Sequence, residues 1–198
     1  MKRRIFALAS VLLLLCSAAG AQSKYKKDKQ KKGDSPMTKT ITFNALPQNC
    51  AELEALPQAK LTDPFEVSAL VVAVLCRYEE SPDDCIAMLN LLKGPQPLSN
   101  YEKQFLKDRL VGKYYVPRSY FNGTSPQNNY EPTKPYSVTI SENAHSHDQE
   151  GYIMLWITSS GADSQRSVKL RKKGDQWFLW ENYLMPDIRK PAAEDPWA

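Results

Sequence analysis

Two histidines and three carboxylates fall close together in the segment SENAHSHDQEG. His145 and His147 are the only histidines of the chain, and the acidic residues are Glu142, Asp148 and Glu150. Side chains two residues apart on a strand share a face, so both imidazoles could meet one metal ion if a strand extended through them. A catalytic zinc also needs a third ligand and a supporting second shell, which a mobile loop does not provide. We therefore predict an exposed hairpin tip, with a metal or acid–base site as the alternative.

A second group of reactive side chains, SSGADS, occupies residues 159–164. Hydrolases place a nucleophilic serine on a strand-to-helix turn with the pattern GxSxG, whereas this segment is expected to join two strands. Gly161 and Asp163 suit a tight connection, so we predict a turn. The alternative is a serine or metal-dependent hydrolase that uses this turn with the loop of His145 and His147. The two segments enter opposite ends of one expected strand, which disfavours a shared site.

Aromatic side chains are the third candidate, because exposed rings beside amides stack on sugars or hold peptides. Six aromatic residues lie in the Pro-rich and Asn-rich segment 113–136, and tryptophans follow in the expected sheet. The predicted ligand-binding residues are Tyr115, Tyr120, Phe121, Asn122 and Trp180. The alternative is that these rings form a core seam, since most of the six should dock on the sheet. No catalytic residue, metal ligand or cofactor is predicted.

The first residues have the pattern of a secretory signal peptide. Basic residues at positions 2–4 precede an apolar run at 5–15, and small residues follow at 19–21. The apolar run is too short to cross a hydrocarbon layer of about 30 Å as a helix. We expect residues 1–21 to be removed and the mature protein to be secreted or periplasmic, with membrane contact only through the signal peptide.

Charge is distributed unevenly along the chain. The whole chain carries +4, but residues 24–40 hold seven lysines and two aspartates, and residues 41–198 are net negative. Nucleic-acid binding requires clustered positive charge on the folded surface, so it is not predicted. The lysine-rich stretch lacks apolar periodicity, and we predict a disordered spacer over residues 22–40 that could also touch anionic surfaces. Residues 41–198 have the length of a single domain.

Capping signals predict four short helices in the first half of this domain. The start signals are Asn49 with Glu52, Asp63 with Pro64, Ser81 with Pro82, and Ser99 with Glu102. The stop signals are Pro57, Gly94 and Gly112. The second helix is apolar almost all round over residues 65–75, so it should be the most buried.

Period-two patterns predict an antiparallel sheet in the second half. The expected strands cover residues 136–141, 152–157, 168–171 and 177–183. Residues 152–157 are continuously apolar, which predicts a central strand covered on both faces. The predicted fold class is therefore α+β, with short N-terminal helices packed on one side of a C-terminal antiparallel sheet of about four strands.

Three cysteines remain after the signal peptide: Cys50, Cys76 and Cys85. Export permits oxidation. Cys76 lies near the end of the second expected helix and Cys85 in the first turn of the third, so two antiparallel helices could bring them within bridging distance. A disulfide between Cys76 and Cys85 and three packed thiols both remain open.

The C-terminal segment MPDIRKPAAEDPWA ends in a tryptophan beside proline. Because tryptophan is highly buried on average, we expect Trp197 to dock in a surface groove. A chemical role for this tail is not predicted.

The segments PRSYFNGTSPQNNYEP, SSGADSQRSVKLRKKGDQWFLWE and DPWA resemble a family of uncharacterised exported bacterial proteins, classed as a domain of unknown function. The resemblance covers about residues 60–198. It implies a bacterial, extracytoplasmic setting. It supplies no catalytic residues to carry over.

These patterns predict a non-enzymatic binding or interaction module at the cell envelope. The reason is that each reactive cluster falls in an expected connection between strands. The expected partner is a glycan, a peptide or a protein, and the alternative is the hydrolase described above.

Overall fold

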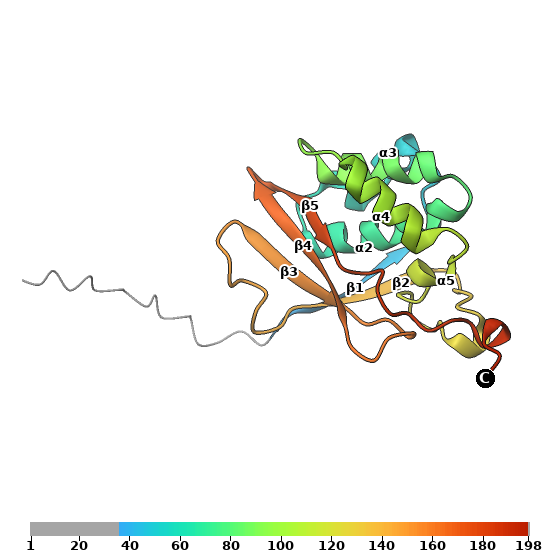
Figure 1. Ribbon diagram of the computed structural model, residues 1–198. Coiled ribbons are helices and arrows are strands. Elements are labelled where there is room, and N and C mark those ends of the chain that lie inside the picture. Colours follow the sequence, from blue (N-terminus) through green and yellow to red (C-terminus); the bar gives the residue numbers. More distant parts are fainter. Residues whose placement is uncertain (1–35, 198) are drawn as a thin grey trace, which may run out of the picture. The chain divides into compact units, whose positions relative to one another are not determined.

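Helices lie on one face of an antiparallel sheet (Figure 1). The structure is a computed structural model that describes residues 36–197. The expected signal peptide and most of the expected spacer lie outside the described residues. Within the described part, no helix has the length and apolar character that crossing a membrane requires.

The four predicted helices are present. They are α1 (Cys50–Ala55), α2 (Pro64–Leu75), α3 (Pro82–Lys93) and α4 (Asn100–Leu110), and a short fifth helix, α5 (Tyr115–Arg118), follows in the aromatic segment. The expected caps form: Asn49 accepts a hydrogen bond from the Glu52 amide, and Ser99 and Glu102 complete a capping box. Local capping chemistry therefore sets where these helices begin.

Helix α2 is the centre of the core, as predicted. Its residues 67–75 are all buried. Helices α3 and α5 pack against it on one side and strands β2 and β5 on the other. A helix that is covered on all sides has no face in contact with water, and this explains why its sequence lacks a polar stripe.

The sheet has five strands, not four. They are β1 (Thr38–Phe43), β2 (Tyr136–Ser141), β3 (Tyr152–Ile157), β4 (Arg166–Lys173) and β5 (Gln176–Asn182), in the order β1-β2-β3-β4-β5. The α+β class was predicted correctly. The first strand was missed because its partner β2 lies about a hundred residues away, and its start at Thr38 falls inside the predicted spacer.

Strand β3 is covered on one face only, which corrects the prediction of two covered faces. Ile153, Leu155 and Ile157 are buried against the helices, whereas Tyr152, Met154 and Trp156 are half-buried on the outer face. Alternation is the ordinary pattern of an antiparallel strand with one solvated side. The outer face of this strand is apolar, and that misled the interpretation.

The aromatic segment docks on the core as expected, but the C-terminal tail does not dock its tryptophan. The 3₁₀ turn Ala192–Glu194 contacts the turn Pro126–Asn128, which places the end of the chain beside the aromatic segment (Figure 1). Trp197 is nevertheless 93% exposed. The prediction that Trp197 docks in a surface groove was therefore wrong.

Candidate functional site

Two adjoining pockets lie along β5 on the side that faces α3 and α4. The first has a volume of about 350 Å³ and the second about 300 Å³. Both are lined by Lys93, Leu179 and Trp180. Their walls are mostly apolar, and β5 is an edge strand. We call the two together the β5 groove.

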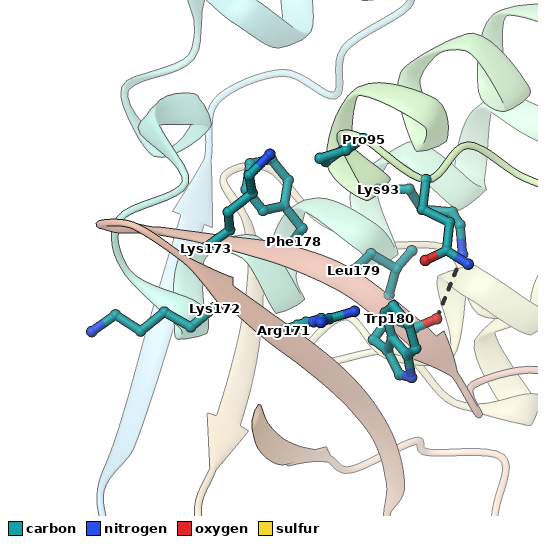
Figure 2. Close-up of a pocket in the computed structure, with 9 residues that line it drawn as sticks. Lys93, Pro95, Arg171, Lys172, Lys173, Phe178, Leu179 and Trp180 are labelled. Atoms are coloured by element: carbon teal, nitrogen blue, oxygen red, sulfur yellow. Dashed lines mark hydrogen bonds between the residues drawn. The ribbon is translucent and has the colours of Figure 1, made fainter. Parts of the chain in front are cut away.

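Lys93 separates the two pockets. It is the last residue of α3, and its side chain crosses toward β5 (Figure 2). The ammonium lies 2.7 Å from Glu102 Oε1 and 3.5 Å from the Trp180 carbonyl oxygen. Only 8% of Lys93 is exposed, and a lysine is this buried only when its charge is paired. The first contact ties the end of α3 to α4, and the second ties it to β5.

Glu102 ties the same lysine to the start of α4. Its other oxygen accepts hydrogen bonds from the backbone amide and the hydroxyl of Ser99. Burial alone raises the pKa of Glu102, but the hydrogen bonds from Lys93 and Ser99 outweigh it, so this pKa lies below its usual value. The carboxylate is therefore ionised near neutral pH and joins α3, α4 and, through Lys93, β5.

Gly94 lies in the chain between Lys93 and Pro95, which both line the first pocket. Its φ of +61° is a conformation that favours glycine. A Cβ atom at this position would lie 2.4 Å from the ring of Phe178. The absence of a side chain therefore lets Phe178 of β5 pack directly on the end of α3, which gives the pocket its wall (Figure 2).

Trp180 is presented by a bulge in β5. Leu179 pairs with Leu170 and Glu181 pairs with Lys169, so Trp180 is the extra residue of the strand. Bulges redirect side chains. Its ring is 5.6 Å from that of Tyr152, and it remains partly exposed in the groove.

The aromatic residues predicted upstream are placed differently. Tyr115, Tyr120 and Phe121 are buried in the core. Tyr120 donates a hydrogen bond to the Leu184 carbonyl, and burial raises its pKa. Tyr115 stacks on Tyr130, with ring centroids 5.9 Å apart. These rings fill the seam between the aromatic segment and the sheet, so they offer no face to a ligand and we remove them as candidates.

Asn122 is exposed, but its side chain is occupied by the sheet. Its amide nitrogen donates to the hydroxyl oxygens of Ser137 and Thr139 at 3.0 and 3.1 Å. Its backbone N–H donates to the Ser137 carbonyl. Asn122 is therefore hydrogen-bonded to β2 through both its backbone and its side chain. It does not line the β5 groove.

The histidine segment is the exposed connection that was predicted. His145 Nδ1 lies 2.8 Å from Asp148, and His147 Nε2 lies 3.0 Å from Glu142. Each imidazole therefore has its own carboxylate. Among residues 36–197, no three His, Cys, Asp or Glu side chains are grouped so that they could hold a metal ion.

The serine turn lies at the other end of β3. Ser159 is buried, and its hydroxyl donates to the hydroxyl of Ser119 at 2.7 Å. Ser160 donates to the Ser119 carbonyl at 3.1 Å. Both hydroxyls fasten the turn to the aromatic segment, and the structure does not bring them together with the histidines.

All three described cysteines are free thiols. Burial raises the pKa of Cys76 to about 12, and burial followed by the proximity of Cys76 raises the pKa of Cys85. A thiol with a raised pKa carries little thiolate and is a poor nucleophile. In this structure the thiols are packing residues, and the bridge between Cys76 and Cys85 is not formed.

Of the residues that line the β5 groove, the sequence analysis named Trp180 as a candidate but not Lys93 or Phe178. A signal for Lys93 was present, because the buried residues Cys85, Met88, Leu89 and Leu92 predict that position 93 continues the apolar stripe of α3. A charged residue in a buried stripe indicates a specific partner. Phe178 had no comparable signal, since its contact with Gly94 joins distant segments.

Comparison with known proteins gives one match. A family model described as Domain of unknown function (DUF6935) matches residues 45–192. No curated protein and no solved structure matches the chain significantly. The matched range covers most of the described helices and strands, including every residue of the β5 groove. The chain therefore belongs to the DUF6935 family, a domain of unknown function.

Proposed function

We propose that this protein is a non-enzymatic binding module that holds an extended peptide in the β5 groove. The observation that carries the proposal is the succession of two mostly apolar pockets along one edge strand, divided by Lys93. Alternate side chains of an extended peptide point the same way, roughly 7 Å apart. Successive pockets along a strand are the usual means of selecting such side chains.

The size of the pockets favours side chains over a larger compact ligand. Pockets for small molecules range from about 300 to 1,000 Å³. Each pocket of the β5 groove lies at the lower end of that range. Each therefore suits one apolar side chain of a longer ligand.

A peptide also fits the chemistry of the walls better than a glycan does. Pro95, Phe178 and Leu179 line the first pocket, and Leu98 and Phe105 line the second. A glycan carries many hydroxyl groups, and each needs a hydrogen-bond partner when it is buried. Mostly apolar walls do not supply those partners.

In this proposal the protein works outside the cytoplasm, either secreted or in the periplasm. The support is the basic, apolar and small-residue pattern of residues 1–21. The hydrolase alternative gains no support, because the histidines and the serine turn lie at opposite ends of β3.

A peptide array and a glycan array, both probed with the full-length protein, test the proposal. We expect peptides with alternating apolar residues to bind, and Trp180→Ala to weaken that binding about tenfold or more, as for an aromatic anchor. Trp197→Ala is the matched control, because it removes an exposed tryptophan outside the groove. Binding to glycans alone, or equal loss in both variants, would contradict the proposal.

A further inference from the structure

The first pocket of the β5 groove carries an excess of positive charge. Besides Lys93, three consecutive residues of β4 line it: Arg171, Lys172 and Lys173. In Figure 2 the Arg171 side chain extends toward Trp180, the Lys173 side chain lies near Phe178, and the Lys172 side chain points away from both. The lining of this pocket includes no carboxylate.

The charge of Lys93 is already neutralised by Glu102, but the three β4 charges are not. Arg171, Lys172 and Lys173 are exposed. Among residues 36–197, none of the three has a carboxylate within ion-pair distance. Their attraction for an anion is therefore not cancelled by the protein itself.

Aromatic rings hold two of these cations beside the pocket. The Arg171 guanidinium carbon lies 4.9 Å from the centre of the Trp180 ring and 5.6 Å from that of Tyr152. The Lys172 ammonium lies 5.6 Å from the Trp177 ring. A guanidinium that is stacked on a ring keeps its N–H groups in its own plane, so they remain available for a carboxylate.

The second pocket contains two carboxylates, and each has a lysine partner. Glu102 and Glu181 line it. Glu102 is bonded to Lys93, and Glu181 lies 4.0 Å from Lys169 and accepts a hydrogen bond from the Tyr183 hydroxyl. Positive charge without a carboxylate partner is therefore confined to the first pocket of the groove.

From this arrangement we infer that the partner is an acidic peptide segment with a defined direction. Its carboxylates lie against Arg171, Lys172 and Lys173, next to an apolar side chain in the first pocket, and the part over the second pocket is not acidic. This inference rests on the proposed function and adds the charge of the ligand. Charge complementarity of this kind determines specificity.

Three labelled octapeptide pools test the inference by fluorescence anisotropy with the full-length protein. All pools carry the same mixture of alternating apolar residues. They differ only in the two residues at one end, which are aspartates in the first pool, asparagines in the second and lysines in the third. We expect the aspartate pool to bind about tenfold more tightly than the asparagine pool, since a carboxylate here gains charge-assisted hydrogen bonds. The preference should weaken with salt, because the Debye length is only about 8 Å at 0.15 M.

The triple variant Arg171→Gln, Lys172→Gln, Lys173→Gln should remove this preference, so that the aspartate and asparagine pools bind with equal affinity. The control Lys60→Gln, Lys107→Gln, Lys190→Gln makes the same change in net charge at exposed lysines outside the groove, and it should keep the preference. Equal binding of the aspartate and asparagine pools by the wild type, or a preference that survives the triple variant, overturns the inference alone. Binding of no pool overturns the proposed function as well.

Vesicles that contain an anionic phospholipid are the remaining probe. We expect them not to compete with the aspartate pool at matched anion concentration. Vesicle binding that the triple variant abolishes, together with no peptide binding, would assign the basic residues to a membrane surface and overturn the inference.

Discussion

The aromatic segment and the β5 groove use the same residue types in opposite ways. In the segment, Tyr120 is 1% exposed and its hydroxyl is bonded to a backbone carbonyl. In the groove, Trp180 is partly exposed and lies beside Arg171. The difference arises from what covers each ring: Tyr120 is enclosed by the core, whereas Trp180 is contacted by Arg171 and Tyr152 and stays partly exposed. An aromatic cluster therefore indicates a binding surface only where an edge strand leaves it open.

Tyr120→Ala should have the largest effect on stability. Removing a fully buried ring costs about 3–5 kcal/mol in unfolding free energy, and the Leu184 carbonyl also loses its donor. Chemical denaturation of the variant measures this cost. Trp180→Ala should lower the unfolding free energy by only about 1 kcal/mol, because this residue is partly exposed already. Equal losses would remove the distinction between the two regions.

Two glycine variants separate the regions by function. A Cβ at Gly94 would meet Phe178, and a Cβ at Gly161 would lie 2.4 Å from the Tyr130 hydroxyl. Each Gly→Ala variant should lose about 1–3 kcal/mol through forced repacking. Only Gly94→Ala should also weaken peptide binding, because only Phe178 lines the groove. Thermal melts measure the stability of each variant, and fluorescence anisotropy on the same samples measures its peptide affinity. Reduced peptide binding by Gly161→Ala would contradict the separation of the two regions.

Lys93→Met should lower the unfolding free energy by about 1–2 kcal/mol at neutral pH. The reason is that the partly solvated Glu102 carboxylate loses a charged hydrogen-bond donor. The pKa of Glu102 is lowered in the folded state. Ionised Glu102 therefore stabilises the folded state fully above its unfolded pKa, which is near 4.5. This stabilisation is lost as the pH falls through the lower pKa of the folded state. Unfolding free energy measured between pH 3 and 7 should show a smaller acid-dependent loss in Lys93→Met than in the wild type. An unchanged pH profile would show that Lys93 does not hold Glu102.

Asn122→Ala should have the smallest effect. Its side chain bonds two exposed hydroxyl groups, so about 0.5–1 kcal/mol should be lost. Peptide affinity should not change, because Asn122 lies outside the groove. A loss of affinity in an anisotropy titration would return Asn122 to the binding surface.

The predictable part of the fold is the part that local chemistry determines. Asp63 before Pro64 and Ser99 before Glu102 set helix starts from neighbouring residues alone. Strand β1 could not be found in this way, because Thr38–Phe43 is recognisable as a strand only beside β2. The α+β class followed from patterns along each element and needed no long-range contact.

The candidate site was less predictable because it is built from distant segments. The first pocket joins the end of α3 to β4 and β5, which are some eighty residues away. Burial of Tyr115 and exposure of Trp197 likewise depend on which segments cover them. A sequence pattern reports that a ring is present, but it does not report what lies above it.

Hydrogen exchange measured with and without the aspartate peptide pool can show whether the open aromatic region at β5 binds the peptide while the closed aromatic segment only supports the fold. We expect slower exchange, on adding peptide, at residues 93–98 and 176–183, and no change at residues 113–135. Protection of residues 113–135 or of the histidine loop at 142–151, with β5 unaffected, would contradict it.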